Sequence, residues 1–252
     1  MPARAPFPFG VGADLLRVDS NKNAKPTARK RETLKEKSRR ANALASRLGK
    51  LYGDVECPLG HQNTFELLIA VILSAQCTDA AVNKVTPALF SRYPTPAALA
   101  DAAIGDIEFL IRTLGLFRAK AKSLKRCAQQ LVTEFAGAVP STMDDLTSLA
   151  GVGRKTANVI RGHAFNIPGI AVDTHCGRLS RRLGLTRQQD PAKVEKDLAR
   201  ILPPAQWTGF SHRLIIHGRR VCAARKPACT RCTLSELCPS SGAGKPSQAA
   251  RQ

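Results

Sequence analysis

The chain has 252 residues, which is enough for one large domain or two modest domains with a real hydrophobic core. Its formal net charge is +20, so nucleic acid is a stronger candidate partner than an acidic membrane surface. The longest apolar run, Leu67–Leu73, is too short to cross a bilayer, and the first residues lack the apolar stretch of a secretion signal. Composition therefore argues against a membrane-spanning or a secreted protein.

Basic residues are concentrated at the start of the chain but are not confined to it. Residues 1–50 hold 13 Lys/Arg and 4 Asp/Glu, and the rest of the chain still has a net charge of +11. Residues 1–30 are rich in Pro, Lys, Arg, Ala and Gly and show no apolar periodicity, so they predict a disordered basic extension. Residues 240–252 are of low complexity and predict a disordered tail.

Between these ends the apolar pattern predicts helices and no strand, which indicates an all-α fold. An amphipathic pattern predicts a helix over 32–52, and a nearly continuous apolar run predicts a buried helix over 65–76. Asp79 can cap the next helix, in which Pro87 should force a break or begin a new helix at its first position. A further helix is expected to start near Pro96. The remaining predicted helices cover residues 106–112, 117–135, 143–149 (capped by Ser141), 154–164, 173–183, 191–202 and 205–220.

The run Leu149-Ala-Gly-Val-Gly-Arg-Lys155 joins two predicted helices and indicates a helix–hairpin–helix over residues 141–164. Two glycines one residue apart, Gly151 and Gly153, permit backbone angles that other residues avoid and leave main-chain N–H groups uncovered. The following helix start adds further N–H groups and a positive dipole end. We therefore expect Gly151, Val152, Gly153 and Arg154 to contact phosphate, although a glycine pair alone can also be a simple turn.

Four cysteines near the end of the chain have the spacing C-x6-C-x2-C-x5-C: Cys222, Cys229, Cys232 and Cys238. Structural zinc sites usually use two close cysteine pairs, and here there is one, so the spacing favours a [4Fe–4S] cluster over zinc. Disulfides are the third alternative and do not suit a DNA-facing intracellular chain. Arg225, Lys226 and Arg231 surround these cysteines and should contact the DNA backbone. The remaining cysteines, Cys57, Cys77, Cys127 and Cys176, are expected to be reduced thiols in or near the core.

Several stretches together resemble the endonuclease III family of DNA glycosylases and AP lyases, within the helix–hairpin–helix–Gly/Pro/Asp superfamily. They are Leu149–Asn158, Ala171–His175, the four-cysteine run, Leu67–Gln76 and Leu114–Phe117. The resemblance covers about residues 35–239. It implies a two-lobed fold, in which one lobe is a six-helix barrel and the other unites the N-terminal helix with the C-terminal helices and the iron–sulfur cluster.

The resemblance also implies a division of the chain into segments. These are the disordered extension 1–30, an N-terminal helix of the cluster lobe 31–56, the six-helix barrel lobe 57–167, the cluster lobe 168–239 and the disordered tail 240–252. DNA would lie across the cleft between the two lobes.

Lys155 has an amine that can attack C1′ of a deoxyribose, expel the base and form a Schiff base, after which β-elimination breaks the strand. A lysine is more often a solvated surface charge, and it is the resemblance that favours the nucleophile. The amine must be neutral to attack; the helix N-terminus and Arg154 favour that form, whereas Asp173 opposes it. Asp173 suits an N-cap, and the resemblance adds a carboxylate that stabilises positive charge on the sugar.

Base flipping leaves a gap that side chains must fill. Gln76, at the end of the buried helix, can hydrogen-bond an orphaned base, and Leu116 can wedge between stacked bases. The simpler alternatives are an ordinary polar helix end and a small core contact. His175 is a candidate phosphate or sugar contact, although a lone histidine is more often structural.

The resemblance implies a bifunctional base-excision enzyme that removes oxidised or ring-damaged pyrimidines through a lysine Schiff base. Its partner would be double-stranded DNA with damaged bases or AP sites, and it would act as a monomer on the bacterial nucleoid in the cytoplasm. One alternative is a monofunctional glycosylase such as the adenine-mismatch type, which lacks a lysine at the position of Lys155. Another is a non-enzymatic iron–sulfur DNA-binding protein, which would not need Lys155 and Asp173 in these contexts.

Overall fold

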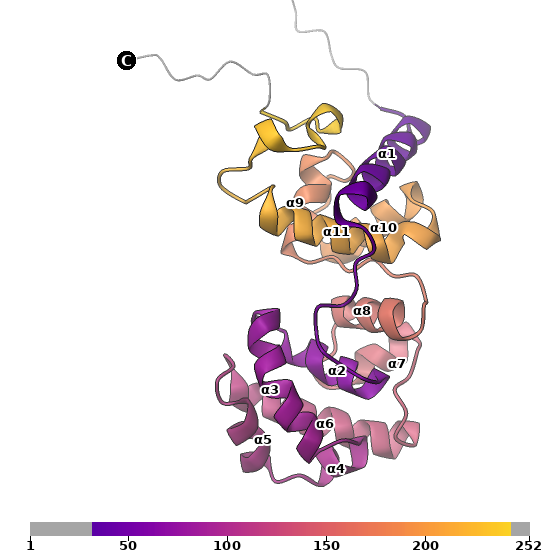
Figure 1. Cartoon of the computed structure of the whole chain (residues 1–252). Helices are drawn as coiled ribbons and strands as arrows, with labels where there is room; N and C mark the ends of the chain where they lie inside the picture. The colour runs from indigo at the N-terminus through magenta and orange to yellow at the C-terminus, as the bar shows by residue number, and fades with distance from the viewer. Residues whose placement is uncertain (1–31, 243–252) are drawn as a thin grey trace, which may run out of the picture. The chain divides into compact units, whose positions relative to one another are not determined.

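The computed structural model describes residues 32–242, and its elements belong to one compact unit that begins at Thr33. The predicted extension 1–30 and residues 243–252 of the predicted tail lie outside the described residues. Eleven α-helices and three short 3₁₀ turns make up the regular structure, and the described residues contain no strand, so the all-α prediction is confirmed (Figure 1).

Eight of the helices come first along the chain. These helices are α1 Leu34–Tyr52, α2 Thr64–Leu73, α3 Asp79–Arg92, α4 Pro96–Asp101, α5 Ile104–Ile111, α6 Phe117–Phe135, α7 Met143–Ser148 and α8 Arg154–Ala164. The following segment holds α9 Thr174–Arg182, α10 Pro191–Ile201, η1 Pro204–Gln206, α11 Trp207–Arg220, η2 Cys229–Arg231 and η3 Ser235–Leu237. Figure 1 shows that α1 lies beside α10 and α11 rather than with α2–α8.

Buried apolar side chains form two clusters. The first lies among α2–α8, with α2 at its centre: every residue from Phe65 to Leu73 is buried, as the continuous apolar run predicts. The second lies among α1, α9, α10 and α11 and includes Phe210 and Leu234. The four cysteines outside the predicted cluster set lie in or against these two clusters, as predicted. The two lobes and their segment boundaries stay a prediction.

Two helix caps and one helix interior differ from the sequence expectations. Pro87 lies inside α3 without a break, because buried Val82 and Leu89 on either side of it hold the helix against the core. Thr78, rather than Asp79, caps α3, since its hydroxyl accepts a hydrogen bond from the N–H of Ala81. In the same way Thr142, rather than Ser141, caps α7.

The α2 helix ends earlier than predicted, at Leu73, and a turn then leads to α3. The N–H of Cys77 donates to the carbonyl of Ser74 at 3.1 Å and closes that turn. Gln76 takes a left-handed φ of 55° in it, which an α-helix does not allow. Gln76 therefore projects from an exposed turn, between the buried α2 and the start of α3.

Candidate active site

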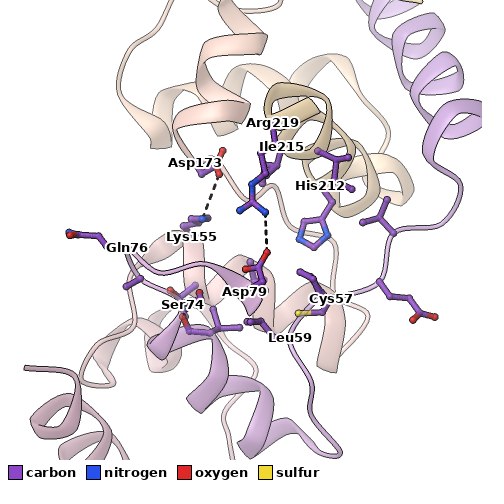
Figure 2. A pocket seen from close by; sticks show the side chains of 18 of the residues that line it. Cys57, Leu59, Ser74, Gln76, Asp79, Lys155, Asp173, His212, Ile215 and Arg219 are labelled. Carbon is purple, nitrogen blue, oxygen red and sulfur yellow. Dashed lines mark hydrogen bonds and ion pairs between the residues drawn. The ribbon is translucent and has the colours of Figure 1, made fainter. Parts of the chain in front are cut away.

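A cavity of about 470 Å³ lies where the start of α8, the turn after α2, the segment Val55–Leu59 and one face of α11 meet (Figure 2). Apolar side chains such as Val71 and Ile215 line it together with a small set of polar and ionisable groups. Those groups are Glu56, Ser74, Gln76, Asp79, Lys155, Thr156, Asp173, His212, Arg219 and Arg220. An apolar pocket with a few convergent polar groups is the usual form of a binding or catalytic site.

Lys155 and Asp173 face one another in this cavity, from the starts of two different helices (Figure 2). Lys155 is the second residue of α8, and its Nζ lies 3.8 Å from Oδ2 of Asp173. The other oxygen of Asp173, Oδ1, accepts a hydrogen bond of 2.8 Å from the N–H of Cys176 and caps α9. Asp173 is thus an N-cap, as expected, and its other oxygen faces the amine.

The exposed fractions of the two side chains suit an amine that reacts with a substrate and a carboxylate that stands beside it. The Lys155 side chain is 52% exposed, whereas that of Asp173 is 12% exposed. A reactive group must be open to its substrate, and a carboxylate that is largely removed from water exerts a stronger field on its neighbours. The arrangement can therefore present an amine to a substrate while a fixed negative charge stands beside it.

The hairpin before α8 depends on one glycine rather than two. Gly151 has φ 82°, and a Cβ there would lie 3.0 Å from Cγ2 of Ile72 and 3.2 Å from Cβ of Ser123. Gly153 is extended, with φ −98°, and a Cβ there would meet nothing, so the expectation of special angles at both glycines is wrong at Gly153. No side chain caps α8 at Gly153, which leaves its first N–H groups available to an anion.

Two other hairpin residues lie differently from the simple phosphate-contact expectation. The side chain of Val152 is buried, and its N–H donates to the carbonyl of Leu149 at 3.1 Å. Arg154 forms a paired contact with Glu195 of α10, with Nε 2.6 Å and Nη2 3.0 Å from the two carboxylate oxygens. Arg154 therefore joins α8 to α10 and shares its charge with a carboxylate.

The remaining predicted DNA contacts are distributed around this site. Gln76 lines the cavity and points away from the other labelled side chains (Figure 2). Leu116, just before α6, is 61% exposed and also has a left-handed φ of 59°. His175 does not line the cavity; its Nδ1 accepts a hydrogen bond from Nη2 of Arg178 at 3.2 Å. Arg225, Lys226 and Arg231 are exposed in the cysteine loop, residues 221–242.

Two features of the cavity escape sequence reasoning. Because Thr78 caps α3, the carboxylate of Asp79 is not needed as a cap, and it forms an ion pair of 3.0 Å with Arg219 of α11 (Figure 2). His212 of α11 lines the wall and contacts His163 of α8, with 3.4 Å between their Nε2 atoms. Burial, and to a lesser extent the charges of His163 and Lys155, lowers the pKa of His212 to about 4, so His212 is neutral at pH 7. The sequence places these residues far apart and gives no motif that joins them.

All four cysteines of the predicted cluster line a second cavity, of about 220 Å³. Around it, Nη1 of Arg182 donates to Sγ of Cys222 at 3.2 Å, and Nε2 of His217 lies 3.3 Å from Sγ of Cys232. Burial, and then the neighbouring thiols, raises the pKa of Cys232 and of Cys238. Within residues 32–242, no three His, Cys, Asp or Glu side chains are grouped as ligands for a single metal ion.

No helix within the described part of the chain is long and apolar enough to cross a membrane. The family model described as "HhH-GPD superfamily base excision DNA repair protein" matches residues 69–204. The endonuclease III of Synechocystis is 52% identical over 208 residues, which are 82% of this chain and 95% of that protein. The endonuclease III of Escherichia coli is 41% identical over 180 residues, which cover 71% of this chain and 85% of that protein.

Solved structures give the same picture. A covalent intermediate of endonuclease III trapped on DNA is 44% identical to this chain, with a TM-score of 0.77. The alignment covers 81% of this chain and 96% of that one. A thermostable thymine-DNA glycosylase shares the fold, with a TM-score of 0.73 at 22% identity.

Proposed function

Because this chain belongs to the endonuclease III family of base-excision DNA repair proteins, we propose that its larger cavity performs glycosylase and AP lyase chemistry with Lys155 as nucleophile. The observation that supports this assignment is an exposed amine at a helix start, 3.8 Å from a largely buried carboxylate. DNA is the partner, as in the solved endonuclease III complexes.

The reaction begins when the neutral Nζ of Lys155 attacks C1′ of a flipped deoxyribose. The C1′–N bond to the base breaks, and the base leaves with the bonding electrons and takes up a proton. The nitrogen loses a proton, and its lone pair then expels O4′, which takes up a proton, so the sugar ring opens to a protonated imine at C1′. Loss of a 2′ proton finally expels the 3′ phosphate and cuts the strand, and hydrolysis of the imine releases the enzyme.

Asp173 assists at two points. Oδ2 can accept a proton that the Lys155 ammonium must lose, and its negative charge stabilises the positive charge that develops on C1′ and O4′. Because Oδ1 is held by the N–H of Cys176, the carboxylate is fixed before the substrate arrives. Its role is thus both proton transfer and preorganised electrostatic stabilisation.

We assign the surrounding residues to DNA binding and base flipping. The uncapped N–H groups at the start of α8 receive a backbone phosphate, and Gly151 allows the close approach of the hairpin. Gln76 and Leu116 enter the duplex from their two exposed turns, where the extruded nucleotide leaves a gap. The side chains of Arg225, Lys226 and Arg231 contact the phosphate backbone beyond the cavity.

The four cysteines fit a [4Fe–4S] cluster better than a single zinc ion. A zinc ion needs its four sulfurs to converge on one point, whereas in a four-iron cluster each thiolate binds a different iron. Four thiols line one cavity, and their spacing, with a single close pair, favours the second arrangement. Cys222, Cys229, Cys232 and Cys238 would hold the cluster, whose chemistry there is ligation that shapes a basic loop.

We also propose that oxidised or ring-damaged pyrimidines are the substrates, that the protein acts as a monomer, and that it works in the bacterial cytoplasm on the nucleoid. The cavity volume of about 470 Å³ is in the range of small-molecule pockets and admits a flipped nucleotide. Cleavage of a panel of duplexes, each with one defined lesion, tests the substrate class directly.

Borohydride trapping tests the nucleophile. Reduction of the imine should leave the enzyme covalently bound to lesion-containing DNA, and Lys155→Ala should lose this product while it still binds DNA through main-chain N–H groups. Lys193→Ala, at an exposed lysine of α10, is the matched control and should trap as well as the wild type. Undiminished trapping by Lys155→Ala would assign the chemistry to another amine. Base release without any trapping in the wild type would instead favour a monofunctional glycosylase.

A further inference from the structure

A buried ammonium outside the active cavity has a thiol as its partner. Lys120 of α6 is only 6% exposed, and its Nζ donates to Sγ of Cys77 at 2.8 Å. An ammonium that is removed from water needs an acceptor, so this contact is costly to lose. Neither residue lines the active cavity, and the chemistry proposed for Lys155 does not use them.

The contact joins the two turns that expose the residues proposed to enter DNA. Cys77 directly follows Gln76 and closes its turn. Lys120 lies one helical turn after Leu116, and its N–H donates to the carbonyl of Leu116 at 3.0 Å. The Cys77–Lys120 contact therefore connects two turns that are 40 residues apart in the chain. Cys77 is the sequence neighbour of Gln76, and Lys120 is hydrogen-bonded to the main chain of Leu116.

Both exposed residues have strained backbones. Gln76 has φ 55° and Leu116 has φ 59°, which lie in the left-handed region that residues with a Cβ avoid. Such conformations persist only where the surrounding structure holds them, and they concentrate at ligand clamps. The other two non-glycine residues with positive φ within the described part of the chain, Ala136 and Asn166, lie at or just after the ends of α6 and α8.

We propose that Cys77 and Lys120 form a positioning pair that fixes the spacing of the Gln76 and Leu116 turns, so that both side chains enter the duplex at one lesion. The inference rests on the proposed function, because it concerns the step that opens the duplex. Two side chains that fill one gap must keep a fixed separation. A charge-assisted hydrogen bond between the bases of the two turns supplies that constraint.

This role has a consequence that a general loss of stability does not have. Duplex substrates require insertion of the two side chains, whereas an AP site in single-stranded DNA has no base stack to open. Breaking the contact should therefore slow strand cleavage at an AP site in duplex DNA and leave cleavage in single-stranded DNA nearly unchanged. The rate of cleavage in duplex DNA divided by the rate in single-stranded DNA therefore measures the effect of the positioning pair.

The experiment measures this ratio for Lys120→Met, Cys77→Ala and Cys77→Ser in the full chain. We expect Lys120→Met and Cys77→Ala to lower the ratio by about tenfold, the effect of one lost charge-assisted hydrogen bond. Cys77→Ser should restore most of it, because a hydroxyl can also accept from the ammonium. Lys125→Met is the matched control: Lys125 is on the same helix, but its Nζ donates to the carbonyl of Ala102.

A double-substitution cycle locates the effect. Adding Lys120→Met to Leu116→Ala should lower the ratio much less than it does in the wild type, because the pair acts through the turn that holds Leu116. If Lys120→Met does not fold, Cys77→Ala and Cys77→Ser provide the same comparison. Ratios equal to that of the wild type in every variant that folds would overturn the inference. Absence of borohydride trapping in the wild type would instead overturn the proposed function.

Discussion

Helices α2–α8 surround a buried apolar cluster that includes Leu68, Leu124 and Ile160, whereas the cysteine loop buries a single apolar side chain, Leu234. The loop is held by polar contacts instead: Arg182 donates to the carbonyls of Ala223 and Ala224, and Arg47 donates to that of Thr233 at 2.8 Å. Burial of apolar side chains thus shapes helices α2–α8, whereas arginine contacts hold the cysteine loop.

The largest effect should come from removing a cysteine ligand. We expect Cys232→Ala to lose the iron and the yellow-brown colour and to lower DNA affinity by more than tenfold, because ligation shapes the basic loop. Most of the helical far-ultraviolet circular dichroism signal should remain, because helices α2–α8 are expected to stay folded. Iron and sulfide analysis of the wild type should give near four of each per chain, and stoichiometric zinc in a colourless sample would contradict the cluster assignment.

A core substitution should give the opposite pattern. Leu124→Ala removes a fully buried side chain of the first cluster and should lower the free energy of unfolding by about 2–5 kcal/mol. The cysteine loop does not touch this site, so the iron content should stay that of the wild type. Urea unfolding and iron analysis of the same sample check the two halves of this prediction, and joint loss of both would show that the regions are not independent.

His212 on α11 contacts His163 on α8, outside the cysteine loop, and should make stability depend on pH. The pKa of His212 is lowered from 6.5 to about 4, so the unfolded chain binds more protons between these values. Stability should thus be complete above pH 6.5 and fall as the pH drops toward 4, by about 3 kcal/mol for this group. His212→Asn should flatten the dependence of the urea midpoint on pH between 4 and 7; an unchanged slope would refute the assignment.

The smallest effect compares the two hairpin glycines. Gly151→Ala places a Cβ at φ 82° and 3.0 Å from Ile72, so we expect a loss of about 1–3 kcal/mol and weaker DNA binding. Gly153→Ala meets no atom and should change stability by less than about 0.5 kcal/mol. Equal effects of the two substitutions would mean that the left-handed angle at Gly151 is not what the hairpin requires.

Sequence alone predicted those parts of the molecule that depend on local pattern. The long helix Phe117–Phe135, the burial of α2 and the cap at Asp173 follow from periodicity and capping chemistry and are as predicted, whereas α2 ends at Leu73 rather than at Gln76. The predicted break at Pro87 was wrong, because packing on both sides of the residue outweighs one missing hydrogen bond and α3 continues across it. Local rules place neither the partner of Arg154 nor that of Asp79, since Glu195 and Arg219 lie far along the chain.

The candidate site divides in the same way. The motif around Lys155 and the cap residue Asp173 are visible in sequence, because each depends on its immediate neighbours. His212 and the Cys77–Lys120 contact are not visible, because tertiary packing alone brings their partners together.

The first described helix has a consequence for the order in which the chain acquires its structure. In α1, Ser38 donates to the carbonyl of Ile201, 163 residues later, and Arg47 forms an ion pair with Glu236. The ribosome releases this helix long before either partner has been synthesised. The apolar face of α1 therefore stays uncovered until nearly the whole chain has left the ribosome. Helices α2–α8 are complete well before that moment and can condense on their own contacts. The half that contains α1 is thus the last to assemble and the one most exposed to chaperones and proteases during synthesis.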